Sequence, residues 1–141
     1  MNECVRITVL VENSVHRPGL MAEHGLSFHV QIGRHNILFD TGQTELVVRN
    51  AKALGLDLSQ LEAIVLSHGH YDHTGGVPAI LGIAPKARVY AHPSAFEMKY
   101  SKRTADEARF IGMSLTTTQA IRHSPCGFTE TRGWTEILTG C

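Results

Sequence analysis

A short apolar run in this sequence leads directly into a cluster of residue types that bind metals, and this arrangement limits the folds that the chain can adopt. Residues 63–66 (Ala-Ile-Val-Leu) form a continuous apolar segment typical of a strand buried on both faces. The next ten residues are Ser67-His68-Gly69-His70-Tyr71-Asp72-His73-Thr74-Gly75-Gly76. A fold that accommodates both must bring a polar, glycine-rich loop out of a buried strand. We therefore expect the chemistry of this chain at a strand end.

The spacing within the cluster favours two metal ions. Residues two apart in an extended segment share a face, so His68 and His70 can direct their rings at one ion, with no side chain at Gly69 between them. Asp72 and His73 follow where the backbone turns and can face a second ion nearby. Imidazole and carboxylate ligands suit zinc, with iron or manganese as alternatives. Two metals about 3.5–4 Å apart can share a water, lower its pKa and polarise the bond that it attacks.

The alternative interpretation is a chance cluster of surface polar residues, in which each histidine merely forms a hydrogen bond. That interpretation would be preferred for a single histidine. Three histidines and one aspartate within six positions, directly after a buried strand, favour a metal site instead.

Hydrophobic periodicity predicts an α/β (α+β) chain with a mixed sheet and flanking helices. Strands are expected at residues 5–11, 26–32, 37–39, 63–66 and 88–91, the second and third as a hairpin. Helices are expected from residue 46 to a stop at Gly55, at 77–81, and in a short piece that opens at 92–94. The segment 104–113 is expected to be helix or loop, and residues 116–141 show strand-like pieces at 135–138 without a clear period.

Composition limits the kind of partner. The 141 residues suit one domain, and an apolar content of 43% excludes a disordered chain. Thirteen basic residues balance thirteen acidic ones, which favours a small-molecule substrate over nucleic acid or a membrane surface. No apolar run approaches the roughly 20 residues of a membrane-spanning helix, and the N-terminus lacks a signal-peptide layout. Three widely spaced cysteines, Cys4, Cys126 and Cys141, imply no disulfide framework, so we expect a cytoplasmic protein.

Two motifs of the sequence resemble those of a known family. His68-x-His70-x-Asp72-His73 is similar to the motif of the metallo-β-lactamase-fold metallohydrolases, and residues 38–42 (Leu-Phe-Asp-Thr-Gly) are similar to the earlier Asp element of the same superfamily. Residues 10–13, 22–27, 39–43 and 66–76 resemble the branch named for dihydropterin-methyl ribofuranosylaminobenzene phosphate synthase, which is linked to methanopterin biosynthesis. The resemblance covers residues 5 to about 100.

The resemblance implies a role for each matched residue. His68 and His70 would bind the first metal, and Asp72 and His73 the second. Asp72 is also the candidate catalytic residue. Asp40 would accept hydrogen bonds and order the metal loop from behind, although an aspartate in a plain Asp-Thr-Gly turn is the alternative.

Two interpretations remain for each of three residues near the motifs. Glu23 and His24 either line the pocket or belong to a plain loop. Tyr71 either packs or donates a hydrogen bond.

The resemblance also implies that part of the family's site is missing from the sequence. In the family, a third His for the first metal, a bridging Asp and a further His come from the second half of a longer αββα sandwich. Residues 1–141 are therefore expected to be the N-terminal half of such a domain, truncated at its C-terminus. His92 and His123 are alternative candidates for the missing ligands. Because they lack the family's surrounding pattern, ordinary surface or core histidines are the preferred interpretation. An uncovered sheet would expose apolar strand faces and favour self-association.

Three functions follow from these expectations. The first is a metal-dependent hydrolase, or a related transferase, of the dinuclear zinc type, in which metal-bound hydroxide acts as nucleophile or base. The second is a catalytically inactive fragment that binds metal. The third is a redox site using iron, as in the flavodiiron relatives, and His70 argues against it because those proteins typically carry an acidic residue at that position.

Overall fold

The computed structural model describes residues 4–102, 104 and 107–138. It contains the following helices and strands in chain order: β1 (Val5–Val11), β2 (Ser27–Ile32), β3 (His35–Phe39), α1 (Leu46–Ala53), η1 (Leu58–Gln60), β4 (Ala63–Val65), α2 (Tyr71–Thr74), α3 (Val77–Ile83), β5 (Arg88–Ala91), η2 (Pro93–Phe96), β6 (Tyr100–Lys102), β7 (Ala108–Phe110), α4 (Leu115–Arg122) and β8 (Phe128–Glu130). None of the helices in the described ranges is long and apolar enough to cross a membrane.

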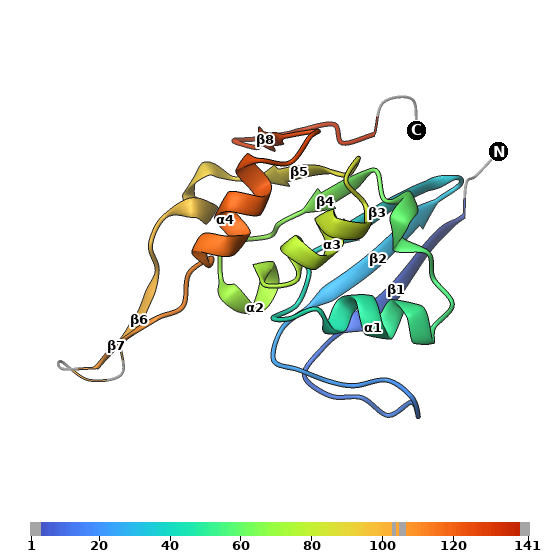
Figure 1. Ribbon diagram of the computed structural model, residues 1–141, viewed down its shortest axis with the longest axis horizontal. Coiled ribbons are helices and arrows are strands. Elements are labelled where there is room, and N and C mark those ends of the chain that lie inside the picture. The colour runs from blue at the N-terminus through green and yellow to red at the C-terminus, as the bar shows by residue number, and fades with distance from the viewer. Residues whose placement is uncertain (1–3, 103, 105–106, 139–141) are drawn as a thin grey trace.

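Six strands form one mixed sheet in the order β1-β2-β3-β4-β5-β8 (Figure 1). The first three pair antiparallel, as the predicted hairpin requires, and β3, β4, β5 and β8 pair parallel. The carboxyl ends of parallel strands meet at one edge of a sheet, which is where α/β folds place their ligands. Asp40 follows the end of β3, and the histidine loop follows the end of β4. The mixed α/β architecture predicted from the periodicity is confirmed.

The helices α1, α3 and α4 lie together on one face of the sheet (Figure 1). The apolar core fills the space between the helices and the sheet, and its central side chains are fully buried. These include Leu38, Val47, Ile64, Ile80, Val89 and Ile121.

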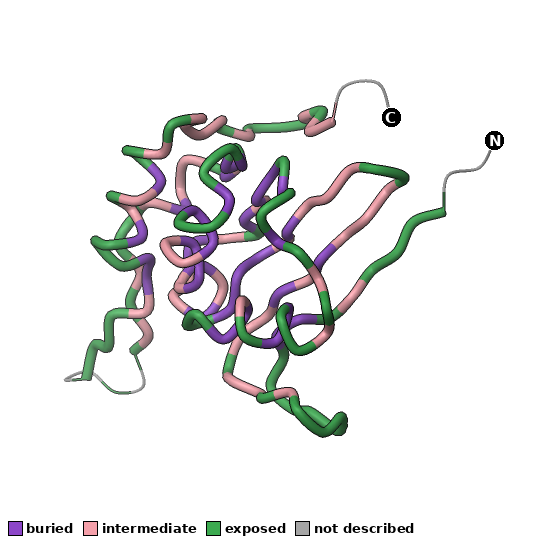
Figure 2. Tube along the Cα trace, turned by 45° about the vertical axis from the view of Figure 1, so that its right-hand side comes forward, coloured by how far each residue is buried: buried purple, intermediate pink, exposed green. Residues whose placement is uncertain are grey.

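The opposite face of the sheet is partly open to solvent. Ile7 pairs with Val30, and Val30 pairs with Ile37, so these three side chains share the face away from Leu38. Ile7 is 63% exposed, whereas Leu38 is 0% exposed. Figure 2 shows the exposed stretch along β1 beside the buried trace of the core. An apolar sheet face without a covering layer is the arrangement expected from the sequence.

Most predicted elements are present, and their ends follow local chemistry. Helix α1 ends just before Gly55, which adopts a positive φ of 72°. Helix α3 carries Pro78 in its first turn, where no helical hydrogen bond is lost.

The structure differs from the predictions at three places in the second half of the chain. Residues 108–110 form strand β7, which pairs antiparallel with β6 in a separate two-stranded hairpin, rather than helix or loop. Helix α4 was not expected, because three consecutive threonines at 116–118 favour extended backbone. Ser114 caps this helix by accepting from the Thr117 amide, and the burial of Thr117 and Ile121 outweighs the low helix propensity. Residues 135–138 form no strand in the structure.

Candidate metal centre

The histidine cluster lies on the loop between β4 and the short helix α2. The backbone of His70 is extended (φ −79°, ψ 150°), and the chain turns into α2 at Tyr71. The His68 ring centroid lies 4.4 Å from that of His70 and 4.2 Å from that of His73. The extended step and the turn therefore bring three imidazoles together, as the spacing in the sequence predicts.

Gly69 allows this loop to lie against the next segment of the chain. A Cβ atom added at Gly69 would lie 1.8 Å from the carbonyl oxygen of Ala95 in η2. A side chain at position 69 would therefore force the histidine loop or η2 to shift. The glycine between the two histidines is required by main-chain packing as well as by the space between the rings.

Asp40 supports the cluster from beneath. Its side chain is fully buried, and its backbone adopts a positive φ of 54°, which is uncommon outside glycine. Its carboxylate accepts hydrogen bonds from the Ser67 amide at 2.8 Å and from the Ser67 hydroxyl at 2.6 Å. Oδ2 of Asp40 also lies 2.7 Å from Nδ1 of His73. These contacts fix both ends of the histidine loop against the end of β3.

The two histidines at the centre of the cluster have pKa values shifted in opposite directions. The hydrogen bond to Asp40 raises the pKa of His73, against an opposing effect of burial. Burial lowers the pKa of His68, and the neighbouring His73 and His70 lower it further. Because Asp40 engages Nδ1 of His73, the Nε2 atom of that ring points away from Asp40.

The donor atoms fit a divalent metal ion. One ligand atom each from Asp40, His68 and His73 lie within 4.8 Å of one another. Oδ2 of Asp72 lies 3.4 Å from Nε2 of His73. A set of imidazole nitrogens and carboxylate oxygens this close together suits zinc, iron or manganese. A carboxylate bound to the far nitrogen of a ligand histidine is a common support for such sites, and Asp40 holds His73 in that way.

His24 joins the cluster from a distant loop. The sequence alone does not distinguish a pocket-lining role for His24 from a place in a plain loop. Its Nε2 atom lies 3.3 Å from Oδ2 of Asp72. The preceding Glu23 accepts hydrogen bonds from the amides of Gln43 and Thr44 and from the Thr44 hydroxyl. The following Gly25 packs so closely that an added Cβ would lie 2.2 Å from the Asp72 carbonyl oxygen. The sequence signal for this placement was the Glu-His-Gly triplet before β2.

Tyr71 is held by the hairpin of β6 and β7. Its amide donates to the carbonyl of Ile111 at 3.1 Å, and an isolated antiparallel bridge joins His70 to Gly112. The Arg109 guanidinium carbon lies 5.6 Å from the centroid of the Tyr71 ring, and its Nη2 donates to the Tyr71 hydroxyl at 3.4 Å. The Tyr71 hydroxyl therefore accepts a hydrogen bond. The sequence carried no signal for this partner.

Two further histidines form local contacts, and the described cysteines form no disulfide. His92 accepts from the Ser94 amide and caps η2, and Nδ1 of His123 lies 2.9 Å from the carbonyl oxygen of Gln119 at the end of α4. Cys4 and Cys126 are free thiols, and Cys141 lies outside the described residues.

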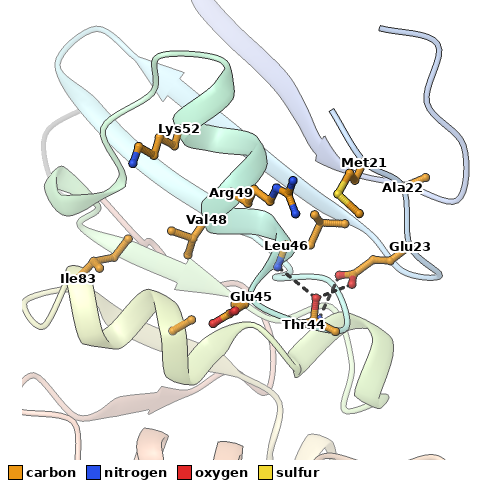
Figure 3. A pocket seen from close by; sticks show the side chains of 11 residues that line it. Met21, Ala22, Glu23, Thr44, Glu45, Leu46, Val48, Arg49, Lys52 and Ile83 are labelled. Atoms are coloured by element: carbon orange, nitrogen blue, oxygen red, sulfur yellow. Dashed lines mark hydrogen bonds between the residues drawn. The ribbon is translucent and has the colours of Figure 1, made fainter. Parts of the chain in front are cut away.

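A well-formed cavity lies away from the histidine cluster. It measures about 690 Å³ and opens between α1, α3 and the loop that carries Glu23 (Figure 3). Its walls are mostly apolar, with the cations Arg49 and Lys52 among its lining residues. No histidine lines it, and its lining offers no cluster of metal-binding side chains. We therefore place the chemistry at the histidine loop, where the donor atoms converge.

Comparison with known proteins agrees with this geometry. A family model of the metallo-beta-lactamase superfamily matches residues 21–139. An uncharacterized protein of Methanocaldococcus jannaschii is 35% identical over 108 residues, 76% of this chain and 40% of that protein. The 7,8-dihydropterin-6-methyl-4-(beta-D-ribofuranosyl)-aminobenzene-5'-phosphate synthase of the same organism is 35% identical over 86 residues, 57% of this chain and 29% of that enzyme.

A solved structure extends the comparison to three dimensions. The crystal structure of a metal-dependent hydrolase of the beta-lactamase superfamily is 31% identical and superposes with a TM-score of 0.67, covering 91% of this chain and 41% of that one. The chain thus spans less than half the length of each of these relatives. Because the family match includes both the Asp40 turn and the histidine loop, we conclude that this chain belongs to the metallo-beta-lactamase superfamily.

Proposed function

We propose that this chain provides the metal-binding half of a metal-dependent hydrolase, or of a related transferase, that uses two zinc ions. His68 and His70 are the proposed ligands of the first ion, and Asp72 and His73 those of the second. The observation that carries the proposal is the convergence of the His68, His70 and His73 rings beside the Asp72 carboxylate at the end of a buried strand.

The surrounding residues would prepare these ligands for metal binding. Asp40 holds Nδ1 of His73, so that Nε2 is the nitrogen presented toward Asp72. Bound zinc would supply an acidified water and would polarise the bond that is attacked. Asp72, with its Oδ2 atom 3.4 Å from Nε2 of His73, would hold the second ion, and its carboxylate is the proposed proton acceptor of the site.

The substrate class proposed is a small molecule, and the finer proposal is a reaction like that of the dihydropterin-type synthase. The 35% identity to the synthase of Methanocaldococcus jannaschii supports it. The zero net charge of the chain also fits a small-molecule substrate better than nucleic acid.

A catalytically inactive, metal-binding fragment is the second candidate function. It would apply if residues 1–141 were to act without the remaining length of the relatives, of which this chain covers 40% in one case and 29% in another. The family ligands expected from the second half of a longer domain have no counterpart in residues 1–141. Under either proposal we expect the isolated chain to hold at most one zinc ion tightly. The first proposal adds slow turnover of substrate, and the second adds none.

Metal analysis of the isolated chain tests the proposal. After zinc loading and dialysis, we expect up to one zinc per chain, and replacement of His68 or His73 by alanine to remove it. The matched control is His123→Ala, which removes an exposed histidine at the end of α4 and should leave the zinc content unchanged. Equal zinc retention in the wild type and the His68→Ala variant would contradict the ligand assignment. Two tightly held zinc ions per chain would overturn the expected limit of one.

Activity then separates the two candidate functions. A phosphodiester and a β-lactam substrate are assayed with the zinc-loaded chain, with and without a chelator. Hydrolysis that the chelator abolishes supports the enzyme, whereas zinc binding without hydrolysis supports the inactive fragment.

A further inference from the structure

The hairpin β6–β7 meets the histidine loop at a point where an arginine has no metal-binding role. The hairpin projects away from the main sheet (Figure 1). Its last strand leads into Ile111 and Gly112, which hydrogen-bond to Tyr71 and bridge to His70. The hairpin is therefore attached by its base to the same few residues that carry the proposed ligands.

Arg109 lies on this hairpin directly against the loop. Its guanidinium stands over the Tyr71 ring, with a distance of 5.6 Å to the ring centroid, and Nη2 donates to the Tyr71 hydroxyl. Tyr71 lies between His70 and Asp72 in the sequence. The Arg109 guanidinium therefore contacts the residue that separates two proposed metal ligands. This cation–π contact and the single hydrogen bond to the Tyr71 hydroxyl hold the guanidinium without using most of its five N–H donors.

Within the described part of the chain, no acidic side chain forms an ion pair with Arg109. The ion pairs that are present there involve other cations. Glu107 lines the same cavity of about 310 Å³ as Arg109, but without an ion pair between them. An oriented guanidinium with free donors beside a metal-ligand cluster suits two-point recognition of an oxyanion.

We propose that Arg109, held on the Tyr71 ring, is a specificity-determining residue that binds a phosphate group of the substrate. The assignment rests on the proposed function in one respect: the phosphate is held next to the bond that the metal centre acts on. Lysine would be a poor replacement, because a single ammonium cannot reproduce the paired hydrogen bonds of a guanidinium.

Binding of phenyl phosphate to the full chain tests this assignment. Titration calorimetry compares phenyl phosphate with benzyl alcohol, an uncharged aromatic of similar size, in both zinc-loaded and zinc-free protein. The variants are Arg109→Met and Arg109→Lys. Arg34→Met is the matched control, since Arg34 precedes β3 and so lies at the end of that strand opposite to Asp40.

We expect Arg109→Met to weaken phenyl phosphate binding roughly tenfold to hundredfold, the range for a lost charged hydrogen-bond pair. Arg109→Lys should recover part of the loss. Benzyl alcohol binding, the zinc content and the thermal unfolding temperature should stay unchanged in both variants.

Three results would overturn the assignment: unchanged phenyl phosphate binding in Arg109→Met, an equal loss in Arg34→Met, or a loss accompanied by a fall in zinc content. A failure of the proposed function is distinguishable from these results. A wild-type chain that holds no zinc contradicts the metal centre, while the zinc-free titration still reports on Arg109.

Discussion

The two faces of the central sheet carry similar side chains in opposite surroundings. On one face, the helices α1, α3 and α4 bury residues such as Leu38 and Ile64 completely. On the other face, Ile7 and its neighbours Val5 and Val9 are each about half exposed or more. β-Branched and aliphatic residues occupy both faces of β1–β4, so composition alone does not distinguish them.

The unequal burial of the two sheet faces indicates which face stabilises the fold and positions the candidate site. Packing on the helical face fixes the ends of β3 and β4, and those ends carry Asp40 and the histidine loop. The open face contributes strand pairing but little burial. Changes on the helical face should therefore affect folding, and changes on the open face should affect association.

The largest expected effect is the loss of a buried side chain from the helical face. Ile64→Ala removes a side chain that is 0% exposed and should cost about 2–5 kcal/mol of unfolding free energy, because the cavity left in the core cannot collapse fully. The matched substitution Ile7→Ala on the open face should cost less than about 1 kcal/mol. Urea denaturation measures both, and equal costs would show that the two faces are buried alike in solution.

A buried amide on the helical face should give the next largest effect. The Asn50 side-chain nitrogen donates to the carbonyls of Leu10 and Met21, both at 2.8 Å, and its oxygen accepts from the Met21 amide. Asn50→Ala leaves these groups unpaired and should cost about 1–3 kcal/mol in the same assay. The exposed neighbour Arg49 on α1 provides the control, and a comparable loss in Arg49→Ala would show that the hydrogen bonds of Asn50 do not cause the effect.

His29 should make the helical face sensitive to acid. Its side chain is 4% exposed, and its Nε2 atom has no hydrogen-bond partner. Burial lowers the pKa of His29 from 6.5, partly offset by a hydrogen bond with Asn36. The unfolded chain therefore binds the additional proton first on acidification, so stability is retained above about pH 6.5 and falls as the pH is lowered towards the folded-state pKa.

The measurement for His29 is the free energy of unfolding as a function of pH, in protein free of metal. We expect the slope below pH 6.5 to be smaller in His29→Leu than in the wild type, by less than the roughly 1.4 kcal/mol per pH unit that one proton allows. His16→Leu, which removes an exposed histidine, should leave the slope unchanged. An unaltered slope in His29→Leu would assign the acid sensitivity to other groups.

The smallest effect on stability is expected on the open face, where the readout is association. Ile7→Lys should change the unfolding free energy by about 0.5 kcal/mol or less, since the side chain is already exposed. It should weaken the self-association that we predict for this face, as measured by sedimentation velocity. Leu115→Lys, at an exposed position of α4 on the helical side, is the control. A monomeric wild type would refute the predicted association.

Much of the fold could be predicted because its signals are local. The apolar run of β4, the hairpin of β2 and β3, and the stop of α1 at Gly55 each depend on neighbouring residues. The segments around β7 and α4 could not be predicted in the same way. Strands of three residues are too short to show a period, and the helix containing Thr116–Thr118 exists because Thr117 and Ile121 are buried.

Residue spacing in the sequence is enough to predict the proposed donor set, three histidines and an aspartate, because an extended step and a turn bring the three imidazole rings together. The residues that contact these four side chains from other parts of the chain are defined by the tertiary structure. Asp40, His24 and Arg109 come from 28 or more residues away in the chain and reach the cluster through strand pairing, a tightly packed glycine loop and a hairpin. The Asp-Thr-Gly turn and the Glu-His-Gly triplet are visible in the sequence, but the contacts that their residues make over such distances are fixed by packing of the whole chain.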